Sequence, residues 1–382
     1  MKIKTLTKKS LALVLAAGLV MSAGGCSGSN GNNSGDAGRI DAQSIRADNQ
    51  AESSSTASEG ENTTASDESA SGESSTPSGD SSKRTQYPLT MTTYGPDGRE
   101  YSMTFEKAPE KVVAVYQGCI ETLLALGLED RIVATAGLDN EVPDDLKAAF
   151  SATNYLDEFT PSKETVTMLE PDMIFSWVSY FREDTLGTPD EWIDKGTNVY
   201  VNTNTAVSQD SLENEFNDIL NIGKIFDVQD KAEEIVNNMK DTIATVKEAA
   251  AAQSGNPSVL VIENLNGTFT NYGANSIAGD MVTQLGGTLA NPDASTVGKE
   301  DIIAANPDVI FVVYMPYTGD DSEAVKQEHL NYILEDEALA SLSAVQNDRV
   351  VPIMLSEIYA SATRTQNGIE TIAQGLYPDL EY

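Results

Sequence analysis

The feature that most constrains this 382-residue chain is a thirteen-residue unit that occurs twice. KETVTMLEPDMIF at residues 163–175 returns as KEDIIAANPDVIF at residues 299–311, with six identical positions. In each copy we expect a helix that opens at Lys-Glu and ends at Pro-Asp. The apolar run that follows is typical of a strand buried on both faces of a parallel sheet. A supersecondary unit used twice at this separation predicts two lobes of related construction with a cleft between them.

The N-terminal segment has the organisation of a secretory signal. Lysines and an apolar run precede small residues and then Cys26. The pattern resembles a bacterial lipoprotein signal, although Ala23 stands where that motif usually has Leu, and ordinary cleavage is the alternative. We expect residues 1–25 to be the signal peptide and Cys26 to be lipidated. Residues 26–86, rich in Ser, Gly and acidic residues, are expected to form a disordered, lipid-anchored tether.

The remaining chain predicts an α/β fold with two Rossmann-like parallel-sheet lobes, at residues 87–207 and 256–382. Strand VVAV, a short glycine-containing loop at Tyr116-Gln117-Gly118, a helix and a further strand indicate parallel pairing with a right-handed crossover. Residues 208–255 are expected to be a helical connection. Apolar residues spaced by three and four predict one long helix at about residues 228–253, which would run ~39 Å and join the lobes stiffly.

Composition limits the chemistry that this chain can perform. The formal net charge of −35 repels nucleic acid and anionic lipid headgroups, so we expect contact with the membrane through the lipid anchor only. The single histidine, His329, excludes a multi-histidine metal site and argues against a Ser-His-Asp triad. Cys119 is expected to be a small buried hydrophobe. We predict no catalytic residue, no metal and no cofactor, so a cleft enzyme is the weaker hypothesis.

The order of several segments carries a family resemblance. PDGREYSMTF, APEKVVAV, ETLLALGLEDRIVA, the doubled unit and ILNIGKIFDVQDKAEEIV together resemble the substrate-binding proteins of ABC importers for iron-siderophore complexes, vitamin B12 and haem, over Tyr87 to Asp379. The resemblance implies two lobes joined by one long helix, a ligand bound in the cleft with little hinge motion, and an ABC permease with its ATPase as partners. The expected protein is a monomer on the outer face of the cytoplasmic membrane of a Gram-positive cell.

Paired glutamates stand at the start of the two repeat copies. A glutamate in the first turn of a helix stabilises the macrodipole, which is the purely structural explanation for Glu164 and Glu300. Both occur at the equivalent place in both lobes, and in the resembling family the matching glutamates dock on arginines of the permease. The resemblance therefore implies permease docking for Glu164 and Glu300. Their neighbours Lys163 and Lys299 are expected to be solvated.

The ligand site is expected beyond the carboxyl ends of the parallel strands, where ligands of open α/β sheets bind. Aromatic side chains there can stack on a flat ligand, and arginines can meet its carboxylates or phenolates. Each aromatic alone is as well explained by core packing, but three at one strand end are not expected all to fit inward. The predicted ligand-binding residues are Tyr116, Gln117, Trp177, Tyr180, Phe181, Arg182, Asn271, Tyr272, Tyr314, Tyr317, Tyr359 and Arg364.

The resemblance favours an iron-siderophore complex as the ligand. The acidic body and the scarcity of arginines in the cleft disfavour a highly anionic triscatecholate and favour a neutral or cationic chelate. Cobalamin or another corrinoid is an alternative, and so is haem with a tyrosine as axial ligand. A hypothesis from another class is a tethered surface sensor or adhesin that binds a protein and imports nothing.

Overall fold

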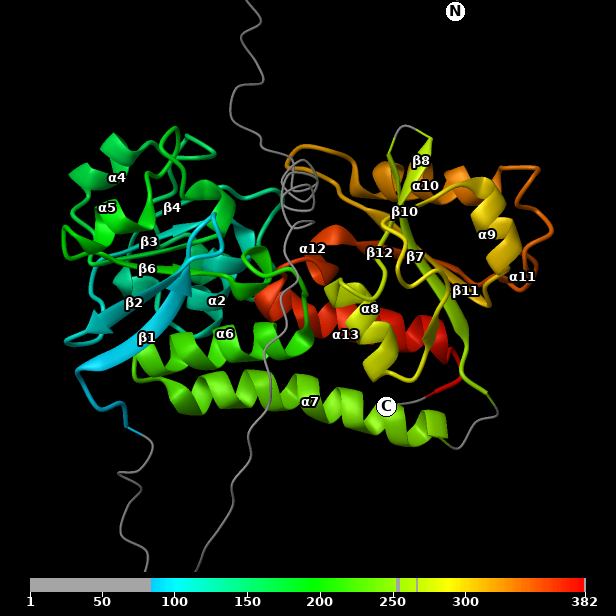
Figure 1. Ribbon diagram of the computed structural model, residues 1–382, viewed down its shortest axis with the longest axis horizontal. Coiled ribbons are helices and arrows are strands. Elements are labelled where there is room, and N and C mark those ends of the chain that lie inside the picture. Colours follow the sequence, from blue (N-terminus) through cyan, green and yellow to red (C-terminus); the bar gives the residue numbers. More distant parts are fainter. Residues whose placement is uncertain (1–83, 252–254, 266, 381–382) are drawn as a thin grey trace, which may run out of the picture. The chain divides into compact units, whose positions relative to one another are not determined.

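The computed structural model describes residues 84–251, 255–265 and 267–380. The predicted signal peptide, Cys26 and all but the last residues of the predicted tether lie outside these ranges. Two β-sheets flanked by helices, preceded by a hairpin, make up the described part (Figure 1). In the same part of the chain, no helix combines the length and the apolarity needed to cross a membrane.

The hairpin opens the described chain. β1 (Leu89–Tyr94) pairs antiparallel with β2 (Glu100–Phe105), and the turn between them contains Gly98 at φ 73°. The hairpin lies beside β6 (Asn198–Val201), whose Val201 N–H donates to Thr93 Oγ1 over 3.2 Å. The turn sequence Pro96-Asp97-Gly98 is typical of such a hairpin.

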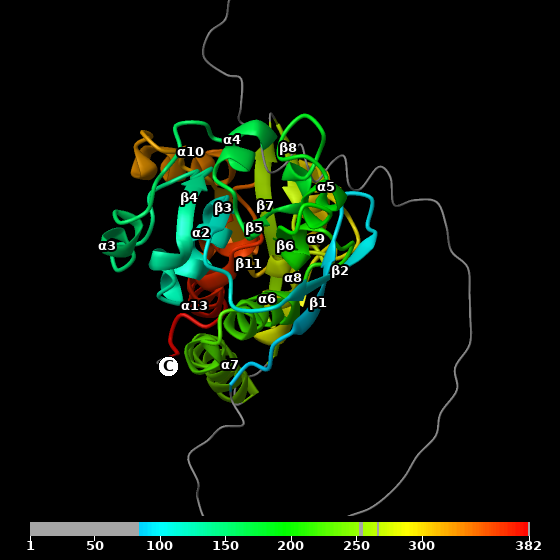
Figure 2. The same ribbon diagram turned by 90° about the vertical axis from the view of Figure 1, so that its left-hand side faces the viewer.

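The first sheet is wholly parallel, with the order β4-β3-β5-β6 (Figure 2). Its other strands are β3 (Val112–Val115), β4 (Ile132–Ala136) and β5 (Met173–Ser176). The helices and 3-10 turns around it are α2 (Gln117–Ala125), η2 (Glu129–Arg131), α3 (Lys147–Phe150), α4 (Lys163–Met168), η3 (Val178–Tyr180), α5 (Pro189–Ile193) and η4 (Thr203–Thr205). Every residue of β3 and β5 is buried, as predicted for strands covered on both faces. The hairpin and this sheet with its helices are called the first lobe.

The loop predicted between β3 and α2 is shorter than expected. Only Tyr116, at φ 89°, separates the two elements, and Gln117 and Gly118 already belong to the helix. A Cβ at Gly118 would lie 2.7 Å from the backbone oxygen of Ala360, so the missing side chain permits this close approach. The predicted three-residue loop is thus wrong, because the helix begins as soon as Tyr116 has turned the chain.

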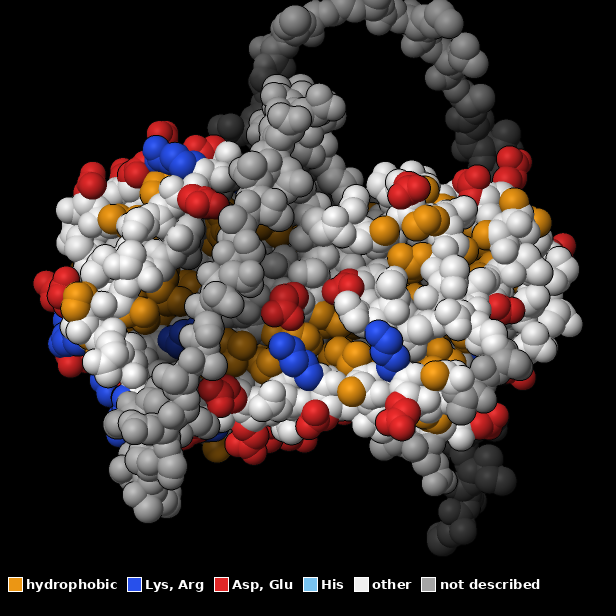
Figure 3. Space-filling view, turned by 60° about the horizontal axis from the view of Figure 1, so that its bottom comes forward, with side chains coloured by type: hydrophobic (Ala, Val, Ile, Leu, Met, Phe, Trp, Pro, Cys, Tyr) orange, Lys and Arg blue, Asp and Glu red, His pale blue; other side chains and the backbone are white. Residues whose placement is uncertain are grey.

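Two helices connect the sheets. α6 (Leu212–Ile225) is followed by α7 (Gln229–Ala251), which confirms the long helix predicted at about residues 228–253. The buried side chains of α7 form one stripe, and the helix contacts α6 and α13 (Thr365–Leu376), as Figure 1 shows. On the face turned forward in Figure 3, acidic side chains are spread widely, in keeping with 59 Asp and Glu against 24 Lys and Arg.

The second sheet has the order β10-β8-β7-β11-β12, and β9 pairs with β7. Its strands are β7 (Ser258–Leu265), β8 (Thr268–Asn271), β9 (Thr288–Leu289), β10 (Thr296–Val297), β11 (Val309–Tyr314) and β12 (Val350–Met354). The strands β7, β9, β11 and β12 pair in parallel, as predicted, whereas β8 runs antiparallel to both β7 and β10 and makes this sheet mixed. Between β7 and β8 the chain turns back at Gly267, at φ 91°, where Asn264 Oδ1 accepts the Gly267 N–H over 2.9 Å.

Helices cover both faces of the second sheet. They are α8 (Ile277–Gln284), α9 (Lys299–Ala305), α10 (Ser322–Leu334), α11 (Ser343–Gln346), α12 (Leu355–Ile358), η5 (Ala362–Arg364) and α13. Side chains alternate along β7: Val259 and Val261 pack with residues of α8 and α13, whereas Leu260 and Ile262 pack with residues of α9, α10 and α11. This sheet with its helices is called the second lobe.

Both copies of the repeated unit form a helix followed by a strand, as predicted. α4 leads to β5 and α9 leads to β11. The aligned residues Glu170 and Asn306 both adopt left-handed backbone conformations where the helix ends, with φ 48° and 40°. The two copies are therefore alike in backbone as well as in sequence.

Candidate functional site

The two lobes meet at a small cavity that lies at the carboxyl ends of parallel strands of both sheets. Its lining residues are Tyr116, Gln117, Gly118, Glu121, Asp139, Met315, Tyr317, Leu355, Ser356, Tyr359, Ala360, Ser361 and Arg364. The cavity measures about 20 Å³, room for roughly one water molecule. Sites for small molecules usually measure roughly 300–1,000 Å³. The cleft predicted between the lobes is therefore closed in this structure.

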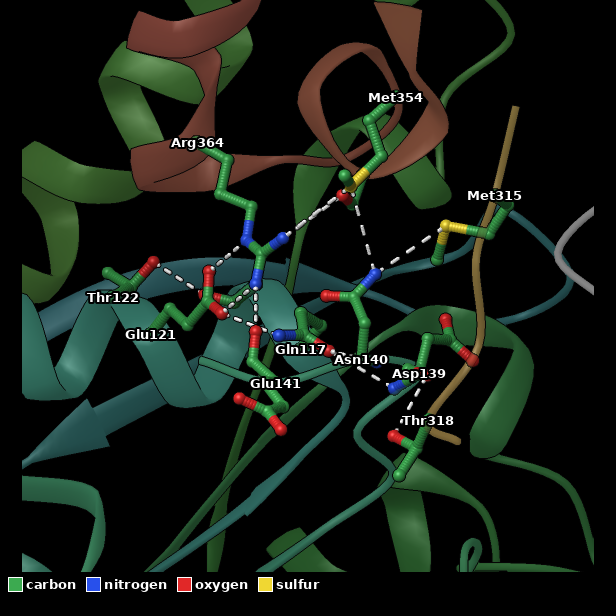
Figure 4. A network of polar contacts seen from close by, with 12 residues as sticks. Gln117, Glu121, Thr122, Asp139, Asn140, Glu141, Met315, Thr318, Met354 and Arg364 are labelled. Carbon is green, nitrogen blue, oxygen red and sulfur yellow. Dashed lines mark hydrogen bonds and ion pairs between the residues drawn. The ribbon is translucent and has the colours of Figure 1, made fainter. Parts of the chain in front are cut away.

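A buried ion pair joins the lobes at this cavity (Figure 4). Arg364 of η5 donates from Nε and Nη2 to the two carboxylate oxygens of Glu121 in α2, each over 2.7 Å. The Glu121 side chain is fully buried and that of Arg364 is 10% exposed. Nη2 also donates to the backbone oxygen of Glu141 over 2.8 Å, and Gln117 Nε2 donates to Glu121 over 2.5 Å.

Arg364, predicted to bind the ligand, is thus engaged with groups of the protein itself in this structure. The reason is the carboxylate of Glu121, which matches the fork of the guanidinium bidentately. Because both charges are removed from water, an anionic ligand group that reaches Arg364 has to replace Glu121 as its partner. Glu121 is a site residue that the sequence reasoning missed.

The loop after β4 is fixed from two directions. Gln117 Oε1 accepts the backbone N–H groups of Asp139 and Asn140 over 3.1 and 3.2 Å. The backbone oxygen of Asp139 accepts the Thr318 N–H of the second lobe over 2.7 Å. Tyr116 donates its hydroxyl proton to the Asp139 carboxylate, and burial, followed by the charge of Asp139, raises the pKa of Tyr116. Gln117 and Tyr116 therefore line the cavity while they also hold this loop.

The three first-lobe aromatics fit inward, contrary to the expectation that they do not. Trp177, Tyr180 and Phe181 are each at most 1% exposed. The Trp177 ring lies 3.6 Å from that of Tyr116 and 5.3 Å, edge to face, from that of Tyr359 in the second lobe, measured between centroids. Tyr359 of the closed second lobe thus covers Trp177, and Tyr180 packs near Tyr116 of its own lobe, with 6.0 Å between the ring centroids. Trp177 therefore lies where the two lobes meet.

Arg182 and two predicted second-lobe residues lie apart from the cavity lining. Arg182 is 41% exposed and faces Asp184, with 3.6 Å between Nε and the carboxylate. Tyr272 is buried and donates its hydroxyl proton to Glu263 over 2.6 Å. Asn271 is 7% exposed and donates from Nδ2 to two backbone oxygens of the segment before β10. In this structure Asn271 and Tyr272 hold the second lobe together.

The remaining predicted tyrosines lie at the strand ends of the second lobe. Tyr314 is half-buried, and Tyr359 is 8% exposed and lines the cavity. Tyr317 is half-buried and lines both the cavity and a larger, open groove of about 600 Å³. The groove, called the second-lobe groove below, is lined by Glu263, Asn264, Leu265, Gly267, Phe269, Lys299, Met315, Tyr317, His329, Tyr332 and Asp336. The sequence analysis did not predict this groove, because one of its walls is β8, a strand that was not expected there.

Two buried acids join α6 to its surroundings. Glu215 accepts the Ala362 N–H of the second lobe and an Asn204 Nδ2 proton, each over 2.6 Å. Burial, followed by the charge of Asp218, raises the pKa of Glu215 to about 8. Asp218 accepts from Thr203 and from the Tyr200 hydroxyl, and burial raises its pKa to about 6. The only sequence feature that could have indicated this buried pair is the spacing of three residues between the two acids on an apolar face of the helix.

The paired glutamates are exposed at the second position of α4 and α9. Their lysine neighbours were expected to be solvated, but each of them forms an ion pair. Lys163 pairs with Glu191 over 2.8 Å, and Lys299 pairs with Asp336. Because each lysine already has an acidic partner, the charges of Glu164 and Glu300 are not neutralised by these neighbours.

Cys119 is fully buried, and burial raises the pKa of its thiol, which confirms the prediction of a small buried hydrophobe. In residues 84–251, 255–265 and 267–380, no cluster of three or more His, Cys, Asp or Glu is arranged to hold a metal ion.

Two α/β lobes, a pair of connecting helices and a cleft that both lobes line define a two-lobed ligand-binding protein. The sequence profile of the periplasmic binding protein family matches residues 112–354, and the chain belongs to that family. It is of the class III type, whose members are the substrate-binding proteins of ABC importers for iron-siderophore complexes and vitamin B12.

Several known proteins are similar to this chain. The petrobactin-binding protein YclQ of Bacillus subtilis (strain 168) is 29% identical over 277 residues, which are 70% of this chain and 80% of YclQ. The uncharacterized ABC transporter substrate-binding lipoprotein YvrC of the same organism is 22% identical over 302 residues, 78% of this chain and 88% of YvrC. The crystal structure of a periplasmic binding protein from Veillonella parvula DSM 2008 has a TM-score of 0.72 and 29% identity, and the match covers 78% of this chain and 93% of that one.

Proposed function

We propose that this protein captures an iron-siderophore complex between its lobes and delivers it to an ABC permease and its ATPase. The observation that carries the proposal is the 29% identity to the petrobactin-binding YclQ across both lobes. The net charge of −35 adds a preference for a neutral or cationic chelate over a highly anionic one. The role is binding and delivery, and no catalytic step is part of it.

Entry of a chelate requires the lobes to separate. A cavity of about 20 Å³ is far below the roughly 300–1,000 Å³ that small-molecule sites offer. Opening replaces the contact of Arg364 with Glu121 and that of Thr318 with Asp139 by contacts to ligand or water. Tyr116, Gln117, Trp177, Tyr317 and Tyr359 line the boundary that opens, and we propose them as the residues that meet the ligand.

Tryptophan fluorescence tests where this site lies. Trp177 stands at the boundary between the lobes, whereas Trp192 is buried inside the first lobe and donates to the Leu186 backbone oxygen over 2.6 Å. Ligand binding is expected to quench the emission of Trp177, and Trp177→Phe removes most of the quench. If Trp192→Phe removes it instead, the proposed site is misplaced.

The protein is proposed to work from a lipid anchor. Cys26 would carry the lipid and the segment up to residue 86 would be the tether, at the outer face of the cytoplasmic membrane; the relative YvrC is named a lipoprotein. In a Gram-positive host, labelled palmitate is expected to mark the wild type. Cys26→Ala should abolish the label and release the protein into the medium, and a label that survives the substitution ends this part of the proposal.

The absorption spectrum of protein purified from its native host tests the ligand class. A ferric siderophore, a corrinoid and a haem have distinct visible bands, so one spectrum separates the proposed chelate from both alternatives. A corrinoid or haem spectrum overturns the siderophore and keeps the import role. A protein that binds none of the three, encoded away from permease and ATPase genes, supports a surface sensor or adhesin instead.

A further inference from the structure

One face of α2 is turned toward the second lobe. Gln117, Gly118 and Glu121 are spaced by three and four residues, so they share one side of the helix. All three line the cavity between the lobes, and Gly118 lets the backbone oxygen of Ala360 come close. Among the described residues of the cavity lining, Arg364 is the only basic one. The buried carboxylate of Glu121 therefore meets the one cation of this lining across the boundary between the lobes.

Every guanidinium nitrogen of Arg364 is engaged in the closed structure (Figure 4). Nε and Nη2 donate to Glu121, and Nη2 also donates to the backbone oxygen of Glu141. Nη1 donates to Ser356 Oγ over 3.2 Å. Ser356 belongs to the second lobe, as Arg364 does, whereas Glu121 and Glu141 belong to the first. Separation of the lobes therefore removes the partners of the Nε–Nη2 edge, while Ser356 keeps the guanidinium in place.

The Glu121 carboxylate is likewise held in place by its own lobe. Gln117 Nε2 donates to it over 2.5 Å, and Gln117 is fixed in turn by backbone N–H groups of the loop after β4. Lys299 of the second-lobe groove differs, because it pairs with Asp336 of the same lobe. Such a pair need not break when the lobes move apart. Glu121 and Arg364, in contrast, each lose their counter-ion on opening, so a ligand that closes the cleft has to deal with both charges.

We infer that Glu121 determines which ligands can bind at Arg364, because its carboxylate is the protein's own occupant of the anion position there. A ligand that offers only an anionic group to Arg364 leaves Glu121 buried without a counter-ion. An uncompensated buried charge is strongly destabilising, so such a ligand is disfavoured. A chelate without an anionic group leaves the pair free to form again as the lobes close. The inference rests on the proposed function and assigns its selection against anionic chelates to one residue.

A small carboxylate tests this occupancy without any chelate. Glu121→Ala removes a group of the size and shape of acetate from the position beside Arg364. Sodium acetate is titrated into the full-length protein, with sodium chloride at equal ionic strength as the reference, and thermal unfolding is followed. Acetate should raise the unfolding temperature of Glu121→Ala saturably, by about 2–4 °C. It should not shift the wild type, where Glu121 fills the position, and adding Arg364→Met to Glu121→Ala should abolish the shift.

Matched chelates test the consequence for ligands. The ferric complexes of N-acetyl and N-succinyl desferrioxamine B share one iron centre and differ in a terminal group, which is neutral in the first and a carboxylate in the second. Glu121→Gln keeps the size of the side chain, so it serves even if Glu121→Ala fails to fold. In Glu121→Gln the affinity for the succinyl complex relative to the acetyl complex should rise about tenfold, through a charge-assisted hydrogen bond to Arg364. Glu110→Gln, the same change at an exposed residue outside the cavity lining, should keep the ratio of the wild type.

The failure of this inference is distinguishable from the failure of the proposed function. The inference is overturned if acetate stabilises the wild type and Glu121→Ala alike, or stabilises neither. It is also overturned if the relative affinity for the two ferric complexes is the same in the wild type and Glu121→Gln, and in that case chelate capture itself still stands. If acetate behaves as expected and no ferric chelate of any class binds, Glu121 keeps its role at Arg364 and the proposed import of siderophores is wrong.

Discussion

The two lobes use the same helix-strand unit but finish their ligand edges differently. In the first lobe a wholly parallel sheet is followed by Trp177, Tyr180 and Phe181, which are all buried, and Trp177 contacts Tyr359 of the second lobe. In the second lobe the chain returns as β8 after β7, and this hairpin forms one wall of an open groove. The repeated unit therefore gives both lobes the same helix-strand framework. The segments outside the two copies determine which ligand edge is buried and which is open.

The lobes also differ in the charges that they bring to the cleft. The first lobe supplies Glu121 and Asp139, and the second supplies Arg364. The closed state pairs Glu121 with Arg364 across the boundary, whereas the Asp139 carboxylate accepts from Tyr116 of its own lobe. Substitutions at this boundary and in the connecting helices test how firmly the lobes are joined. Substitutions in the two repeat copies test how far the lobes are equivalent.

The largest effect is expected at the ion pair between the lobes. Arg364→Met leaves the carboxylate of Glu121 buried without its partner, which costs about 3–5 kcal/mol of unfolding free energy or opens the cleft. Urea unfolding measures the first outcome and small-angle scattering of the ligand-free protein measures the second. Lys107→Met, which breaks an exposed pair with Glu110, is the control and should cost about 0–1 kcal/mol.

A double variant separates the pair from its surroundings. Glu121→Leu combined with Arg364→Met removes both charges, so its cost should be clearly smaller than that of Arg364→Met alone. If the single variant is as stable and as compact as the wild type, the pair does not hold the lobes together.

The next effect concerns the paired glutamates as docking residues for the permease. Glu164→Ala and Glu300→Ala should each remove a charge-assisted contact of about 1.5–3 kcal/mol with the permease and leave ligand affinity within a few-fold. Uptake of an iron chelate by cells is the measurement, and the double variant should transport far less than either single one. A collapse of ligand binding in step with transport would make these residues ligand or folding determinants, and no change in either would leave only the macrodipole role.

Sequence reasoning succeeded where a local pattern carries the information. The Pro-Asp steps and the continuous apolar runs placed the strands β5 and β11, and the apolar spacing placed α7 within two residues at each end. It failed where contacts join distant segments. Glu121 and Arg364 are 243 residues apart, and no spacing indicates that they meet. Trp177 was expected at an open edge because its cover, Tyr359, belongs to the other lobe.

A third effect should appear in the pH dependence of stability. Burial raises the pKa of Glu215 to about 8, so the folded protein binds this proton more tightly than the unfolded chain does. The contribution of this proton to the unfolding free energy is complete below about pH 4.5. It is lost as the pH rises toward 8, at no more than about 1.4 kcal/mol per pH unit. Asp218, with its pKa raised to about 6, contributes at the acidic end of this range only.

The decline of the unfolding free energy between pH 6 and 8 is therefore assigned to Glu215. Glu215→Gln should flatten the unfolding free energy over this interval, even if the amide lowers its level by placing a donor against the Ala362 N–H. Glu213→Gln, at a side chain on the same helix that is 65% exposed, should keep the slope of the wild type. An unchanged slope in Glu215→Gln would assign the decline to other groups.

The smallest effect compares the starts of the two repeat helices. Ser162 caps α4 by accepting the Thr165 N–H over 3.1 Å, whereas the N-cap residue of α9 is Gly298, which has no side chain to accept such a bond. A Cβ at Gly298 would meet Asp301 Oδ2 at an ordinary 3.5 Å, and the backbone φ of −93° suits any residue. Gly298→Ser should therefore raise the unfolding free energy by a few tenths of a kcal/mol, and Ser162→Gly should lower it by about as much. Paired thermal unfolding scans resolve such changes as shifts of about 1 °C. A loss in Gly298→Ser would mean that the bond from the Gly298 N–H to Asp301 already caps the second copy as well as serine caps the first.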